Sequence, residues 1–137
     1  LKQGTRQLSQ TYPHVVQIQK EKVFEVTKTE KGYQVITNKN TYMAKIVVIA
    51  VGPSNLFNIK GLEGFVMPHK KLPAAKNRIQ LKNKDHFIEE GLYVAGVLAG
   101  WRSQYATAAG SGAHVATDIL TLWNKGQTAM VHDSESK

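Results

Sequence analysis

The sequence predicts an α/β fold that combines a parallel sheet with an antiparallel β-meander and a long C-terminal helix. Three observations lead to this prediction. Residues 23–37 alternate polar and apolar, as antiparallel strands do. The continuous apolar run at 46–51 is typical of a strand buried on both faces. Apolar residues recur at helical spacing after residue 103. With 137 residues, 42% of them apolar, the chain is long enough for one domain.

The N-terminal residues predict a helix followed by a short strand. One side of the helix predicted at residues 1–12 is more apolar than the other, and Pro13 prevents the helix from continuing. Residues 15–18 are expected to form a short apolar strand. Because the chain begins with Leu1 rather than Met, we expect a processed or truncated product whose N-terminal part is missing.

The strongest local pattern is the predicted meander. Strands are expected at 23–28 and 33–37, with turns at 30–32 and 38–40. The chain then continues through Thr41 to Ala44 into the apolar run.

That run extends from Lys45 to Gly52 and predicts a strand buried on both faces, as in a parallel sheet covered by helices. Pro, Gly, Asn and Lys dominate residues 53–76, which predicts an irregular connection with a turn at 61–65. A further short strand is expected at 79–81.

A glycine-rich strand at 90–100 leads into a helix that begins with small residues at 103–112. Such a junction lets a ligand lie directly on the backbone, and the helix N-terminus offers unpaired N–H groups with positive partial charge. The first interpretation is therefore a site for a large cofactor. The alternative is that the glycines and alanines only allow close helix–sheet packing.

The final helix is predicted over 103–123, with Gly126 as its C-terminal cap. Residues 125–137 form a polar tail that we expect to be disordered. The helix is expected to pack through one stripe of residues, namely Tyr105, Ala109, Ala113, Ala116, Leu120 and Trp123.

Composition excludes several kinds of chemistry. The chain has no cysteine, so it holds no disulfide, thiolate metal site or dithiol redox pair. No apolar run is long enough to span a bilayer and no signal-peptide core is present, so we expect a soluble, cytoplasmic protein without a membrane partner. The net charge is +8, but the lysines are spread along the chain, which favours a solvated surface over nucleic-acid binding.

No set of residues predicts a metal site or a catalytic group. Glu89 and Glu90 would point to opposite sides of an extended chain, which argues against a carboxylate dyad. His114 lies within the last predicted helix, where a packing or surface role is expected. The histidines are scattered without metal-ligand spacing, at His14, His69, His86, His114 and His132.

Four stretches, in order, are similar to a known family. Residues 1–13 resemble a helix that precedes a meander, and residues 42–52 resemble a strand ending in an Ala-Thr-Gly turn, with Val in place of Thr. Residues 59–62 resemble an Ile-Pro-Gly segment, and residues 91–112 resemble a second flavin-binding segment. Together they resemble the FAD domain of the pyridine nucleotide-disulfide oxidoreductases, most closely the thioredoxin-reductase-like flavoproteins. The resemblance implies an incomplete FAD/NAD(P)-binding Rossmann-like domain over 1–124.

The resemblance also implies cofactor contacts at Gly52, Gly96, Val97, Gln104 and Tyr105. Gly52 would lie near the adenosine or pyrophosphate, and Gly96 near the ribityl chain and pyrophosphate. The backbone N–H groups of Gln104 and Tyr105 would meet the flavin pyrimidine edge. Val97 replaces the Asp that in the family accepts a hydrogen bond from a cofactor hydroxyl, a loss of about 0.5–1.5 kcal/mol or more for a charged acceptor. Alternatively, Gly52 is only a strand end and Gln104 only an exposed first-turn residue.

The resemblance implies part of a compact FAD-dependent oxidoreductase, in which this chain forms the flavin-side wall and NAD(P)H is a candidate electron donor. The Gly-x-Gly-x-x-Gly segment and the nicotinamide-binding insertion of the family are both missing from the chain. We therefore expect this chain to be inactive alone and to need the missing N-terminal segment or a second chain, with a homo-oligomer as a further option. The alternative is a non-catalytic binding or interaction module derived from the same fold.

Overall fold

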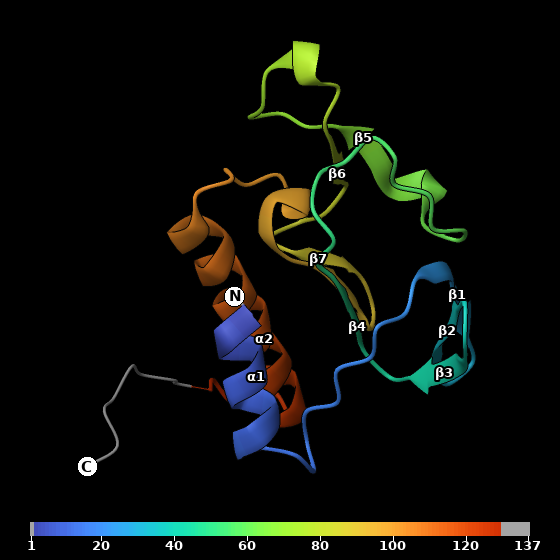
Figure 1. The fold of residues 1–137 in the computed structure, drawn as a ribbon, viewed down its shortest axis with the longest axis vertical. Coiled ribbons are helices and arrows are strands. Elements are labelled where there is room, and N and C mark those ends of the chain that lie inside the picture. Colours follow the sequence, from blue (N-terminus) through green and yellow to red (C-terminus); the bar gives the residue numbers. More distant parts are fainter. Residues whose placement is uncertain (1, 130–137) are drawn as a thin grey trace.

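The computed structural model describes residues 2–129, which form a mixed α/β fold of small sheets and two α-helices (Figure 1). Leu1 and most of the predicted tail, residues 130–137, lie outside the described residues. The helices are α1 (Lys2–Thr11) and α2 (Tyr105–Trp123), with short 3-10 turns η1 (Glu63–Phe65), η2 (Ala74–Lys76) and η3 (Gly96–Ala99). The strands are β1 (Val23–Thr29), β2 (Gly32–Thr37), β3 (Thr41–Ala44), β4 (Val47–Ile49), β5 (Val66–Pro68), β6 (Ile79–Leu81), β7 (Phe87–Glu89) and β8 (Leu92–Val94).

The predicted meander is confirmed. Strands β1, β2 and β3 form an antiparallel sheet in that order, with Val26 opposite Val35 and Val35 opposite Tyr42. The third strand ends at Ala44 and is separate from the apolar run that follows. The meander is joined to the rest of the fold by Lys60, whose backbone exchanges hydrogen bonds of 2.9 and 2.8 Å with Val26 and Phe24 of β1.

The second sheet has the strand order β4-β8-β7 and contains a short parallel pair, β4 with β8. Strand β7 pairs with β8 in the antiparallel sense, and β5 pairs with β6 likewise. Pairing among the described strands is therefore mostly antiparallel, and the predicted parallel sheet is reduced to one pair. In Figure 1, β4 and β7 lie between α2 and the meander, while the β5–β6 hairpin extends away from them.

The core lies on both sides of β8, because successive side chains of a strand point to opposite faces. Leu92 and Val94 belong to the larger cluster, which also includes Val26 and Tyr33 of the meander. Tyr93 and the following residue, Ala95, belong to a smaller cluster with Val115 and Ile119 of α2. Strand β8 is thus the element buried on both faces.

The prediction of a strand at 45–52 buried on both faces is wrong in length and burial. Strand β4 covers only Val47–Ile49, and the Val48 side chain is 40% exposed. Strand β4 is partly exposed because it lies at the edge of its sheet, while the buried residues of α2 pack against β8.

The predicted helix at 103–123 is confirmed as α2, but its predicted packing stripe is wrong. The buried residues of α2 are Ser111, Val115 and Ile119, which are spaced four residues apart. Every residue of the predicted stripe is exposed, including Tyr105 and Trp123. The C-cap residue is Asn124 rather than the predicted Gly126, which lies two residues further on and donates its N–H to the Thr121 carbonyl at 3.0 Å.

Other predictions have mixed outcomes. Helix α1 and the strand at 79–81 are confirmed, the latter as β6. Residues 15–18 form no strand, since they pair with no other segment in the described chain and Val15 is 82% exposed. The connection at 53–76 contains β5, which the prediction misses, as it misses β7. Among the helices of residues 2–129, none is both long and apolar enough to cross a membrane.

Candidate functional site

Two of the predicted cofactor residues, Gly52 and Gly96, follow the carboxyl ends of the paired strands β4 and β8. Because these strands are parallel, with Ile49 beside Val94, both ends lie at the same edge of the sheet. The Ala95 N–H extends the pairing by donating to the Ile49 carbonyl at 2.9 Å. We call Gly52 and Gly96 the glycine edge.

The backbone conformation favours glycine at both positions. Gly52 has φ of 84° and Gly96 has φ of 76°, a region that other residues rarely adopt. A Cβ atom built on either glycine would meet no other atom within 4 Å. The space beside both residues is therefore open, and close packing of helix on sheet does not explain these two glycines.

The segment after β8 is held by hydrogen bonds within the protein. The Gly96 N–H donates to Ser111 Oγ at 2.8 Å, which ties the glycine edge to α2. The Val97 carbonyl lies 2.8 Å from Nε2 of His69 and also accepts the Gly100 N–H at 3.0 Å. Val97 thus contributes its backbone to the fold, while its side chain offers no hydrogen-bonding group.

Gln104 and Tyr105 stand at the start of α2, as predicted. Gln104 is the N-cap residue, with extended backbone angles, and makes no side-chain capping bond. The Tyr105 side chain is 73% exposed. Of the five predicted residues only Gly52 lines the pocket beside the start of β1, so the structure does not bring them into one cavity.

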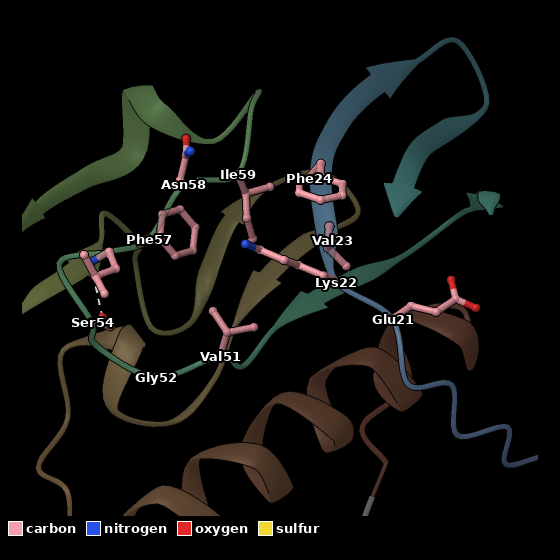
Figure 2. Close-up of a pocket in the computed structure, with 11 residues that line it drawn as sticks. Glu21, Lys22, Val23, Phe24, Val51, Gly52, Ser54, Phe57, Asn58 and Ile59 are labelled. Carbon is pink, nitrogen blue, oxygen red and sulfur yellow. Dashed lines mark hydrogen bonds between the residues drawn. The ribbon is translucent and has the colours of Figure 1, made fainter. Parts of the chain in front are cut away.

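A pocket of about 460 Å³ opens beside Gly52, between the start of β1 and the loop after β4 (Figure 2). We call it the Gly52 pocket. Its walls are mainly apolar, with the rings of Phe24 and Phe57 among them. In Figure 2 the Lys22 side chain extends into the middle of the view, whereas the Glu21 side chain points away from it. The Lys22 ammonium lies 5.5 Å from the centre of the Phe24 ring, so this pocket combines aromatic surface with a positive charge.

A larger hollow of about 690 Å³ lies beside the β5–β6 hairpin, and it contains none of the predicted cofactor residues.

The structure also reveals a cluster that the sequence does not predict, formed by Asp85, His86 and His114. We call it the histidine cluster. The His86 side chain is fully buried, and its ring lies between those of Trp101 and His114, with centroid separations of 5.3 and 5.1 Å. Its Nε2 lies 2.6 Å from Ser111 Oγ, the same oxygen that accepts the Gly96 N–H.

The other members of the cluster lie nearer the surface. The Asp85 carboxylate is 3.5 Å from Nδ1 of His86 and 3.2 Å from Nε2 of His114. Asp118, one turn further along α2, lies 3.5 Å from Nε2 of His114. The hydrogen bond with His114 holds the pKa of the Asp85 carboxyl below its usual value, against the opposing effect of desolvation.

Ser111, His86 and Asp85 have the residue types of a serine-nucleophile triad, but the Ser111 hydroxyl is not placed for that chemistry. Ser111 is 1% exposed, and its oxygen already accepts the Gly96 N–H. A nucleophile must reach a substrate, so the arrangement supports positioning of His86 rather than attack by Ser111.

The sequence holds weak signals for this cluster. His114 and Asp118 have the i,i+4 spacing that places them on one helix face. Asp85 and His86 both have positive φ, of 49° and 75°, a turn conformation that a sequence does not reveal. Asp85 and His86 meet His114 and Asp118 only because the turn at residues 85–86 folds against α2.

No known protein family matches the chain, and no curated protein matches it. The flavoprotein resemblance therefore stays a prediction.

Proposed function

We propose that this chain forms the flavin-side wall of an FAD site in a compact, thioredoxin-reductase-like oxidoreductase. The observation that carries the proposal is the glycine edge, because Gly52 and Gly96 come from separate segments and follow adjacent parallel strands. In open α/β sheets, ligands bind outside the carboxyl ends of parallel strands. The left-handed backbone and open space at both glycines would let a cofactor approach the main chain.

The start of α2 fits the flavin end of such a site. Its first-turn N–H groups have no partners within the helix, and Gln104 provides no side-chain cap. The positive end of the helix dipole would stabilise the negative charge that a flavin ring gains on reduction. When bound, FAD would supply the hydride-transfer chemistry, with NAD(P)H as a candidate donor.

The Gly52 pocket fits the adenosine end. The rings of Phe24 and Phe57 offer surfaces against which an adenine could pack, and the Lys22 ammonium could pair with a phosphate. In this proposal the meander, which supplies Phe24 and is preceded by Lys22, covers the adenosine side.

Two features favour a second candidate function, a non-catalytic binding or interaction module. Val97 provides no carboxylate for a cofactor hydroxyl, and no Gly-x-Gly-x-x-Gly segment is present. The first proposal therefore requires a further segment or a second chain to complete the site. The exposed side chains of Leu120 and Trp123 on α2 are compatible with contact to such a partner.

The test is the visible absorption of the purified full chain, followed by titration with FAD and measurement of flavin fluorescence. We expect flavin bands or saturable quenching. G52V should weaken binding at least about tenfold, which corresponds to 1.4 kcal/mol. Gly126 is the matched control, because it has φ of 81° and equally open space, but lies beyond α2. A colourless chain without quenching would contradict FAD binding by this chain alone, and equal losses in G52V and G126V would contradict the role of the glycine edge.

A further inference from the structure

A buried histidine nitrogen without a partner is the starting point. Nδ1 of His86 is buried and makes no hydrogen bond within the described part of the chain. It faces a carboxylate oxygen of Asp85 at 3.5 Å, which is too far for a normal hydrogen bond. A buried polar atom left unsatisfied is costly, so this nitrogen calls for a partner.

The opposite side of the ring suggests what that partner is. Nε2 of His86 lies 2.6 Å from Ser111 Oγ, and this oxygen also accepts the Gly96 N–H. If Nε2 carries the proton and donates it to Ser111, the lone pair of Nδ1 faces the Asp85 carboxylate. In this tautomer a cation between the two acceptors would satisfy both of them.

We propose that Asp85, His86 and His114 bind a divalent transition-metal ion of the zinc type. One donor atom from each residue lies within 4.8 Å of the other two. Tetrahedral zinc, with bonds of 2.0–2.1 Å, separates its donors by about 3.3 Å. Oδ1 of Asp85 lies 3.5 Å from His86 Nδ1 and Oδ2 lies 3.2 Å from His114 Nε2, so the side chains are near this spacing and would close in around a bound ion.

The surroundings fit this ligand set. Imidazole nitrogens and a carboxylate are common zinc ligands. A metal-binding histidine usually donates its second ring N–H to a neighbouring acceptor, the position that Ser111 occupies here. Ser111 is thus a positioning residue for His86.

The site opens to solvent on one side. The side chains of Asp85 and His114 are 70% and 45% exposed, while His86 forms the buried wall. Asp118 lies 3.5 Å from His114 and could provide a fourth ligand, which would otherwise be water. The ion would join α2 to the turn before β7, two segments that are distant in sequence.

The test uses the full chain without an affinity tag, freed of metal by dialysis against EDTA. Calorimetric titration with Zn²⁺ should show saturable binding of one ion per chain. Titration of a W123F variant with Co²⁺ should quench the remaining tryptophan, since the Trp101 ring lies 5.3 Å from that of His86. No FAD is added, so the result does not depend on the proposed flavin function.

Variants identify the ligands. H114Q and D85N alter exposed side chains and should weaken Zn²⁺ binding at least about tenfold, and S111A should weaken it by about 10–100-fold. The matched control is H14Q, because His14 is exposed and lies outside the cluster. Circular dichroism checks that each variant folds. The absence of saturable binding, or a loss in H14Q equal to that in H114Q, would overturn the proposal.

Discussion

The meander and the region around β8 are stabilised in different ways. In the meander, strands β1 to β3 follow one another in sequence and pair through short turns. Around β8, only β7 is a neighbour in sequence, whereas β4, which pairs on the other side, and α2, which packs on one face, come from more distant segments. Both candidate sites, the glycine edge and the histidine cluster, lie at this second region.

The difference between the two regions shows where polar side chains become buried in this fold. Short turns bring together residues that are already close in sequence, and many meander side chains are exposed, such as Tyr42 and Met43. At β8, distant segments enclose a fully buried His86 and a buried Ser111. Burial of polar groups is what tunes their reactivity and metal affinity, so the non-local region has the greater functional potential.

The largest expected effect comes from shortening a core side chain of β8. Leu92 is 0% exposed, so L92A should lower the free energy of unfolding by about 2–5 kcal/mol. The matched change in the meander is M43A, because Met43 is 64% exposed, and it should cost no more than about 0.5 kcal/mol. Urea unfolding monitored by circular dichroism measures both. Similar losses in the two variants would remove the contrast between the regions.

A smaller effect is expected from S111A. Removing the hydroxyl leaves the Gly96 N–H and Nε2 of His86 without their shared partner, which should cost about 1–3 kcal/mol. The control is S9A, since the Ser9 hydroxyl makes an exposed hydrogen bond to its own helix. If urea unfolding shows S111A to be as stable as S9A, the Ser111 contacts do not stabilise this region.

The smallest effect is expected in the meander, from E21Q. The Glu21 carboxylate accepts hydrogen bonds from Thr37 at 2.5 Å, Tyr42 at 2.6 Å and Asn40 at 3.0 Å. The bond from Thr37, followed by that from Tyr42, lowers the pKa of Glu21 from its usual 4.5.

Because the folded pKa is lowered, the contribution of Glu21 to stability is present above pH 4.5 and is lost as the pH falls through the folded pKa. E21Q should therefore reduce the acid sensitivity of the thermal midpoint slightly, as scanning calorimetry between pH 3 and pH 7 would show. E30Q serves as a control at an exposed carboxylate. An unchanged pH profile in E21Q would indicate that solvent screens these contacts completely.

Sequence reasoning succeeds where structure is local. The alternation of residues 23–37 and the turns between them predict the meander, and the helical spacing after 103 predicts α2. The predicted strands are too long, because Gly52 is expected at the end of a strand and Gly96 within one, whereas both glycines follow the shorter strands β4 and β8. Their place at one shared edge depends on parallel pairing and is known only from the structure.

Sequence reasoning fails where burial depends on packing between segments that are distant in the sequence. Helix α2 carries two stripes with similar spacing, and the bulkier one, with Tyr105 and Trp123, predicts the wrong buried face. The buried stripe instead includes Ser111, whose hydroxyl has partners supplied by the β8 region. His86 is missed for the same reason, because its neighbours Trp101 and His114 come from later parts of the chain.

The shared Ser111 oxygen has a thermodynamic consequence. It accepts the Gly96 N–H and also makes a hydrogen bond with the His86 ring, so it belongs to both candidate sites. If an ion at His86 changes the affinity of the glycine edge for a cofactor, that cofactor must change the affinity for the ion by the same factor. Measuring either binding constant with and without the other ligand would give the coupling free energy between the two sites.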